Sequence, residues 1–130
     1  MPDKISTAWF LAALVVFLFK HLFADFILQT SWMANGKERE QGWIVPLTVH
    51  AGIHAATTAL IFYAWLPVYF WMAGVDFAVH FVIDRAKGET GRALKVDNTQ
   101  SVYWWIFGVD QTLHHLTHLG FALLIAVARS

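Results

Sequence analysis

The stretch Asp76–Asp84, which reads DFAVHFVID, places three polar side chains four residues apart in an otherwise apolar run. A spacing of four puts side chains on one face of an α-helix, so this stretch predicts an apolar helix with a single polar stripe. Three other apolar segments repeat the spacing, with the stripes His21, Asp25 and Gln29; His50 and His54; and Asp110, His114 and His118. Ionisable groups are expensive in hydrocarbon, so charges within a membrane indicate a functional site.

The composition favours lipid over water as the main solvent of the chain. Of the 130 residues, 58% are hydrophobic and 14% are charged, whereas soluble domains carry about 25% charged residues. The formal net charge is zero and no dense basic run occurs, so nucleic-acid binding is not expected. The sequence contains no cysteine, which leaves histidine and carboxylate as the available metal ligands.

Four segments approach the roughly 20 apolar residues that a membrane-spanning helix needs. They cover about residues 6–29, 43–65, 67–86 and 102–128. We therefore expect one integral membrane domain over residues 1–130, with an all-α fold: a four-helix transmembrane bundle that encloses an inward-facing His/Asp layer. Leu66 and Pro67 leave almost no loop between the second and third helices, which predicts an antiparallel hairpin.

Lysine and arginine predict the orientation of the bundle, because cytoplasmic loops carry an excess of both. The first and third connections hold most of them: Lys37, Arg39, Arg85, Lys87, Arg92 and Lys95. Both termini should then be non-cytoplasmic. At 1.5 Å of rise per residue, the four stripes fall in one layer in the cytoplasmic half of the bilayer. Lys20, His21 and Asp25 interrupt the place of a signal-peptide cleavage site, so we expect the first helix to be retained.

The polar layer offers ligands for a divalent metal ion. His50 and His54 form an H-x-x-x-H pair, which lets two imidazoles reach one ion. The third stripe can supply one ligand and orient another. We expect metal ligands at His50, His54, His80, Asp84, Asp110 and His114. These side chains suit zinc, iron or manganese, and zinc is expected first. The alternative is a hydrogen-bonded network that pairs the helices without an ion.

Other polar residues are candidates for supporting roles. Asp25 and Asp76 are the candidate catalytic residues, each as a general base or as an orienting group. Lys87 would steady an anionic leaving group, and its cluster of cations could bind a lipid headgroup or phosphate or only set the topology. His21 and His118 belong to the stripes, and Gln29 is expected to cap its helix or lie in an interface.

Four short motifs span nearly the whole chain: Ala24-Asp25-Phe26-x-Leu28-Gln29, His50-x-x-x-His54, His80-x-x-x-Asp84-x-x-Lys87 and Asp110-Gln111-x-Leu113-His114. Together they resemble a family of small bacterial and phage membrane proteins, the domain of unknown function 3307. The resemblance implies a multi-pass protein of the bacterial inner membrane and adds Gln111 to the candidate site, but implies no activity. A looser similarity is to membrane-bound metal-dependent hydrolases.

Three function classes follow from these observations. The leading hypothesis is a metal-dependent hydrolase that acts on a lipid-linked or amphiphilic substrate from the membrane. One alternative is a proton or divalent-cation transporter or channel subunit, for which a homodimer would be more suitable. The other is a non-catalytic structural or partner-binding protein. The outer half of the third helix, residues 68–75, has only Tyr69 as a polar group, which favours a one-sided site over a path through the membrane.

Overall fold

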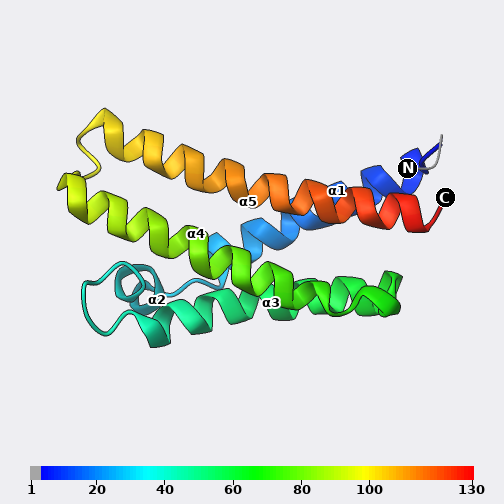
Figure 1. The fold of residues 1–130 in the computed structure, drawn as a ribbon, viewed down its shortest axis with the longest axis horizontal. Coiled ribbons are helices and arrows are strands. Elements are labelled where there is room, and N and C mark those ends of the chain that lie inside the picture. The colour runs from blue at the N-terminus through cyan, green and yellow to red at the C-terminus, as the bar shows by residue number, and fades with distance from the viewer. Residues whose placement is uncertain (1–3) are drawn as a thin grey trace.

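Helices make up nearly all of the computed structural model, which describes residues 4–130 (Figure 1). In chain order they are α1 (Thr7–Leu22), the π-helical turn η1 (Phe23–Ile27), α2 (Ser31–Gly36), α3 (Ile44–Trp65), the 3₁₀ turn η2 (Pro67–Tyr69), α4 (Met72–Leu94) and α5 (Ser101–Ala128). No β-strand occurs among the described residues, so the all-α prediction is confirmed.

The third predicted helix starts later and is longer than expected. The segment 67–86 contains the turn η2, and α4 then continues to Leu94. Hydropathy falls in the second half of α4, but a polar helix continues there because Arg85 and Glu89 form an ion pair four residues apart. The helix ends where Lys95 adopts a left-handed backbone conformation, with φ of 53°.

The connection between the first two predicted helices holds α2, a short helix that apolar periodicity did not indicate. The Thr30 hydroxyl caps it by accepting a hydrogen bond from the Met33 backbone N at 3.3 Å. The helix packs closely on the start of α3, where a Cβ at Gly36 would lie 2.6 Å from Pro46 Cγ. This approach carries Lys37, which follows α2 directly, into the interior, where it is 4% exposed.

The four long helices close into one bundle. α3 and α4 form the antiparallel hairpin that Leu66 and Pro67 predicted, α5 packs against α1 and α4, and α1 contacts α3. The start of α1 and the end of α5 lie side by side at one end of the bundle (Figure 1). There the Ser6 backbone N donates to Ser130 Oγ at 3.0 Å. The connection between α4 and α5 lies at the opposite end, which is also where α2 packs.

Two helices in the described part of the chain are long and apolar enough to cross a membrane. They comprise Thr7–Ile27, which is α1 with η1, and Ile44–Trp65, which is α3. α4 and α5 are as long but carry more polar residues. The four-span arrangement predicted from the sequence is therefore supported directly at two of its four segments.

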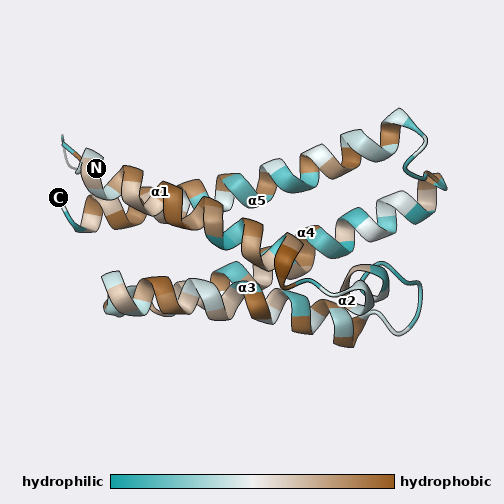
Figure 2. Cartoon of the chain, turned by 180° about the vertical axis from the view of Figure 1, so that it is seen from behind, coloured by the Kyte–Doolittle hydropathy of each residue, from teal (hydrophilic) through white to brown (hydrophobic). Residues whose placement is uncertain are grey.

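Burial in this bundle is inverted relative to a water-soluble protein. Among the described residues, buried polar or charged side chains outnumber buried hydrophobic ones. Every long helix exposes large apolar side chains, for example Leu18, Leu60, Val82 and Leu116. Figure 2 shows apolar residues along the helices near the two termini and hydrophilic residues gathered toward the opposite end. The outer surface is thus suited to lipid and the interior is polar.

An apolar cluster closes the interior near the termini. It consists of Ala13, Phe17, Phe62, Phe121, Ala122 and Ile125, and we call it the apolar plug. The ring of Phe17 packs against those of Phe62 and Phe121, with centroid distances of 6.3 and 5.6 Å. The buried polar residues begin next to the plug and continue toward the other end of the bundle.

Replacing Gly36 by alanine is expected to destabilise the fold. The added Cβ would lie 2.6 Å from the ring of Pro46, which is buried and cannot rotate away, so overpacking should cost about 1–3 kcal/mol. Gly52→Ala is the control, because its Cβ would meet nothing within 4 Å. Thermal unfolding in detergent should show a lower midpoint for Gly36→Ala alone. Equal midpoints would contradict the packing of α2 on α3.

Candidate functional site

The π-helical turn η1 directs the end of α1 into the bundle. A π turn adds a residue to the helical turn and is frequent at functional sites. Lys20 and His21 lie in the last turn of α1 and Asp25 lies in η1, and all three are buried. Gln29 Nε2 donates to the Asp25 backbone carbonyl at 3.0 Å. Gln29 therefore has the capping role expected from the sequence.

The polar stripes of the helices converge in the interior. Their members other than Gln29 are each at most 8% exposed. We call the buried polar residues the polar core: Lys20, His21, Asp25, Lys37, His50, His54, Thr58, Asp76, His80, Asp84, Asp110, His114 and His118. The structure thus brings together all six predicted metal ligands, both predicted catalytic aspartates, and His21 and His118. Gln111 is half-buried at its edge.

Lys20 lies at the centre of one part of the polar core. Its Nζ donates to Asp76 Oδ2 at 2.8 Å. It also lies 3.2 Å from both His54 Nδ1 and His118 Nε2. Thr58 Oγ1 donates to the same Asp76 oxygen at 2.6 Å. Three groups from three helices therefore surround one buried ammonium, and its charge is compensated by Asp76.

Lys20 fixes the tautomer of His54. A lysine ammonium can only donate, so His54 Nδ1 accepts from it. The other ring nitrogen of a neutral imidazole then carries the hydrogen, and His54 Nε2 donates to Asp25 Oδ1 at 2.8 Å. A line of hydrogen bonds therefore runs from Asp76 through Lys20 and His54 to Asp25.

Asp25 is the meeting point of three imidazoles. Its Oδ1 lies 2.8 Å from His54 Nε2 and 3.2 Å from His50 Nε2. Its Oδ2 lies 3.2 Å from His21 Nε2 and accepts from Gln111 Nε2 at 3.2 Å. His21 Nε2 and Gln111 Oε1 are 2.8 Å apart, so His21 donates to Gln111 as well. Four side chains from three helices thus surround one carboxylate, and His54 and Gln111 donate hydrogen bonds to it.

Asp84 connects this group to a second carboxylate. Its Oδ2 lies 3.1 Å from His50 Nε2 and accepts from Lys37 Nζ at 3.0 Å. Its Oδ1 lies 3.7 Å from His114 Nε2. The other nitrogen of His114, Nδ1, lies 3.6 Å from Asp110 Oδ1. Asp84 therefore has one oxygen beside His50 and the other beside His114.

Lys87 marks the edge of the polar core toward the hydrophilic end of the bundle. Its Nζ lies 3.6 Å from Asp110 Oδ2 and 3.2 Å from Glu38 Oε1. Gln111 Nε2 donates to the same Asp110 oxygen at 3.1 Å. Asp110 also lines an apolar groove of about 500 Å³ between α4 and α5, so this carboxylate lies between the core and the outer surface.

Charge pairing in the polar core is complete for three of its four aspartates. The pairs are Lys20–Asp76, Lys37–Asp84 and Lys87–Asp110. Within residues 4–130, no lysine or arginine lies within ion-pair distance of Asp25, whose partners are histidines and a glutamine. Since an unpaired buried charge is costly, Asp25 requires an imidazolium or a bound cation.

Four groups of polar-core side chains bring three potential ligand atoms within 4.8 Å of one another. The groups are His21, His54 and His80; Asp25, His50 and His54; Asp76, His80 and His118; and Asp84, Asp110 and His114. The buried Nε2 atoms of His50, His80 and His114 have no hydrogen-bond partner among the described residues. Such atoms are rare in folded proteins, and this donor set fits a divalent ion of the zinc, iron or manganese type.

Three polar-core residues are not among the predicted site residues: Lys20, Lys37 and Thr58. For Lys20 the sequence leaves open whether it extends to the membrane surface or faces the bundle, and the structure places it inside. Thr58 follows His54 by four residues, so the spacing rule could have found it. Lys37 carries no such signal, because its burial depends on how α2 folds onto α3.

A family model with the description "Protein of unknown function (DUF3307)" matches residues 13–129. No curated protein and no solved structure matches the chain, so the looser similarity to membrane-bound metal-dependent hydrolases is not shown. The family match extends over all four long helices and contains every member of the polar core. Because the match covers nearly the whole sequence, the chain belongs to the DUF3307 family, whose function is unknown.

Proposed function

We propose that this protein spans the bacterial inner membrane four times, binds a divalent metal ion in its polar core and hydrolyses a lipid-linked or amphiphilic substrate. The environment of Asp25 carries the proposal. This carboxylate lies against the Nε2 atoms of three buried histidines and has no lysine or arginine partner among the described residues. Zinc is the favoured ion, with iron or manganese as alternatives.

The outward side chains of α4 and α5 support the proposal of four spans. Both helices carry a polar stripe, but the stripe is buried. Their exposed residues include the apolar Val75, Val82, Val109 and Leu116. Mean hydropathy averages both faces of a helix, whereas lipid contacts only the outer face. The lysines and arginines of the two connections would lie on the cytoplasmic side, and both termini on the other side.

Asp25 and His50 supply the first ligands of the proposed ion, in a group with His54. His50 Nε2 lies 3.2 Å from Asp25 Oδ1 and 3.1 Å from Asp84 Oδ2, yet it makes no hydrogen bond within the described residues. Neighbouring ligands in a tetrahedral zinc site are about 3.3 Å apart when each bond is about 2.0 Å long. The spacing of His50 Nε2 and Asp25 Oδ1 thus supports a ligand role for Asp25, beyond the base or orienting role that the sequence favours.

His54 can complete this set of ligands only if the hydrogen leaves its Nε2. Its Nε2 donates to Asp25 while Lys20 donates to Nδ1, and a ring nitrogen that carries hydrogen cannot bind an ion. Metal binding would therefore either move this hydrogen to Nδ1, with loss of the Lys20 hydrogen bond, or release it as a proton. In this proposal Lys20 opposes loading of the ion.

His80 and His114 extend the ligand surface beyond His54. The ring of His80 stacks on those of His54 and His114, with centroid distances of 3.8 and 4.1 Å. The Nε2 atoms of His80 and His114 have no partner in the part of the chain described. Asp110 lies next to His114, so these three residues are proposed as further ligands, either of the same ion or of a second one.

An orienting role suits Asp76 better than that of a general base. Its Oδ2 accepts hydrogen bonds from Lys20 and Thr58. His80 Nδ1 donates to the Asp76 backbone carbonyl at 3.1 Å and lies 3.0 Å from Asp76 Oδ1. Asp76 is fully buried and does not line the groove between α4 and α5, so it is poorly placed to take a proton from substrate. Carboxylates that bind the second nitrogen of a histidine orient that ring toward a metal ion, and we assign this role to Asp76.

Substrate would reach the polar core from the lipid side. The groove between α4 and α5 is lined mainly by apolar side chains such as Val82, Val109 and Leu113, and Asp110 lies in its wall. An amphiphile in this groove would therefore meet the polar core at Asp110. A divalent ion bound there would supply a Lewis acid that activates water and polarises the scissile bond. Lys87, 3.6 Å from Asp110, would steady an anionic leaving group.

Transport is the second candidate function, because hydrogen bonds connect Asp76 with Asp25 through the polar core. The apolar plug argues against it. Phe17, Phe62 and Ile125 are fully buried across the interior at the end near the termini. The polar core therefore approaches only one end of the bundle, which favours a one-sided site.

Asp25→Asn is expected to abolish metal binding, because the variant keeps the shape of the side chain and removes its charge. Wild-type protein purified in detergent without chelator should carry about one zinc, iron or manganese ion per chain by elemental mass spectrometry. The variant should carry less than about a tenth of that amount. Asp97→Asn is the matched control, because Asp97 is exposed and hydrogen-bonded to Thr99.

Folded wild-type protein that takes up none of these ions, even from added zinc, would refute the metal centre. Asp25 would then be paired with an imidazolium, and a non-catalytic structural or partner-binding role would account for the polar core.

Hydrolysis is expected to require the ion. Amphiphilic esters, amides and phosphate esters would be presented in mixed micelles, with products detected by mass spectrometry. Chelation should lower turnover at least about 100-fold, and added zinc should restore it. Asp97→Asn should behave as wild type. Turnover that survives complete removal of metal would contradict the mechanism, and no turnover of any substrate class by the metal-loaded protein would contradict the hydrolase.

Proteoliposomes are expected to be impermeable to protons and divalent cations, because the apolar plug interrupts the polar path. A trapped pH-sensitive or zinc-sensitive dye should report the leak rate of protein-free vesicles under an imposed gradient. A flux that is present in wild type and lost in Asp25→Asn would instead establish a transport path through the polar core.

A further inference from the structure

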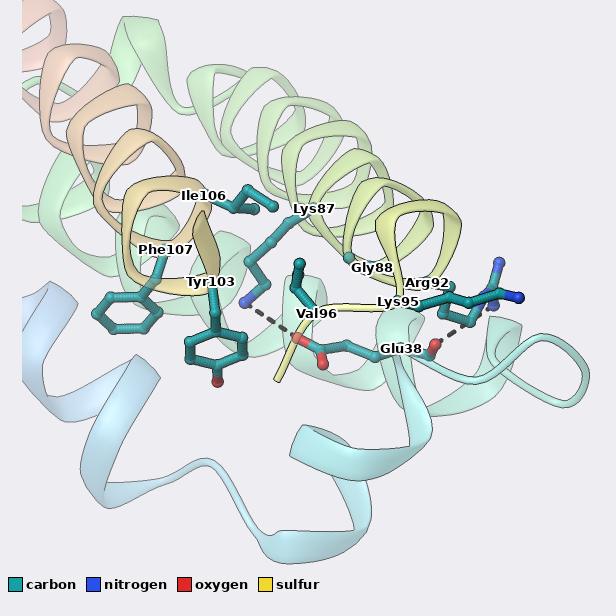
Figure 3. A pocket seen from close by; sticks show the side chains of 10 residues that line it. Glu38, Lys87, Gly88, Arg92, Lys95, Val96, Tyr103, Ile106 and Phe107 are labelled. Atoms are coloured by element: carbon teal, nitrogen blue, oxygen red, sulfur yellow. Dashed lines mark hydrogen bonds and ion pairs between the residues drawn. The ribbon is translucent and has the colours of Figure 1, made fainter. Parts of the chain in front are cut away.

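A second, polar cavity lies on the other side of Lys87 from the apolar groove. It has a volume of about 240 Å³, and its lining includes Glu38, Arg92 and Lys95 (Figure 3). Lys87 and Ile106 line both the cavity and the groove. Two side chains therefore separate an apolar space from a polar one.

The lining of the polar cavity carries an excess of positive charge. Lys87, Arg92 and Lys95 are lining residues, and Glu38 is the one carboxylate among them. Figure 3 shows Lys87 pointing across the cavity toward Glu38, and the Lys87 Nζ lies 3.2 Å from Glu38 Oε1. Arg92 donates to the Glu38 backbone carbonyl at 3.3 Å. Outside the lining, Asp110 also pairs with Lys87 and Glu89 with Arg92, whereas Lys95 has no ion-pair partner among residues 4–130. Three cations gathered around one space can bind an anionic ligand by exchanging these carboxylate partners.

Glycine keeps part of the cavity wall open. Gly88 and Gly91 of α4 both line it. A Cβ at Gly91 would meet nothing within 4 Å, so a larger side chain at this position could extend into the cavity without a backbone clash.

The apolar groove and the polar cavity are adjacent, as the chain and the headgroup of a lipid are. The groove has apolar walls and runs between α4 and α5, whose outer faces are apolar. The cavity lies toward the end of the bundle where hydrophilic residues gather (Figure 2). Lys87 stands between them, within reach of a group that enters from either side.

We propose that the groove and the cavity together bind one anionic, phosphate-bearing lipid, with its chain between α4 and α5 and its headgroup beside Lys87, Arg92 and Lys95. Phosphate accepts hydrogen bonds from lysine and arginine, and it is the charged group of anionic membrane lipids. The headgroup takes the place of the Glu38 carboxylate at Lys87. This inference names the substrate class of the proposed hydrolase, and turnover of the lipid rests on that proposed function. Binding of the lipid does not require the metal ion.

Native mass spectrometry in a neutral detergent tests the headgroup. Phosphatidic acid and phosphatidylcholine are added separately at equal concentration, and inorganic phosphate is added as a competitor. Phosphatidic acid should be retained at least about tenfold more than phosphatidylcholine, and phosphate should not displace it. Lys87→Met should weaken retention about fivefold, and Glu38→Gln should strengthen it.

Space-filling variants test the two compartments. Gly91→Leu fills the cavity and Ala86→Phe fills the groove, and each should abolish retention of phosphatidic acid. Gly74→Leu and Ala78→Phe are matched controls on α4, because neither residue lines the cavity or the groove. Both controls should retain the lipid as wild type does.

Equal retention of the two lipids, or displacement by inorganic phosphate, would overturn the proposal. Unchanged binding in Ala86→Phe would exclude the groove, and loss of a dimer in that variant without loss of lipid would assign the groove to a second copy of the chain. The measurements are repeated with chelator and with Asp25→Asn, in which lipid should still bind. Failure of the metal centre and failure of the lipid site are thus distinguished.

Discussion

The structure depends on the mutual compensation of charges that lie out of reach of water. Each buried aspartate other than Asp25 has a lysine partner from a different part of the chain, as Lys20 of α1 does with Asp76 of α4. Leaving one charge of a buried pair without its partner costs several kcal/mol. Apolar contacts between helices are less selective in lipid, because lipid tails are as apolar as the side chains. Charge pairing and hydrogen bonding therefore determine which helices meet and in what register.

The same constraint makes Asp25 distinctive. Its place in the π-helical turn η1 brings its carboxylate to His50 and His54 of α3 and to Gln111 of α5. Among the described residues, no lysine forms an ion pair with it. The one buried aspartate without a lysine partner thus lies among histidines, of which His21 and His50 have ring nitrogens without a hydrogen-bond partner. A cation at this point would complete the charge balance that the rest of the polar core achieves internally.

The two ends of the bundle have different properties, and the difference arises from side-chain packing. Near the termini, Phe17, Phe62 and Phe121 fill the interior and exclude polar groups. Toward the other end, α4 and α5 leave a groove and a polar cavity that share Lys87. The polar core is therefore approached from the hydrophilic end and from the groove between α4 and α5.

The sequence by itself determined the helical class, the ends of α3 and α5 to within about a residue, and the convergence of the stripes, because apolar length and four-residue spacing are local properties of a helix. Tertiary structure decided what each polar group touches. Lys37 becomes buried because Gly36 lets α2 approach Pro46. Lys20, the buried lysine nearest to Asp25 in the sequence, pairs with Asp76 instead. Such pairings join residues far apart in the chain, and no local spacing encodes the distance between them.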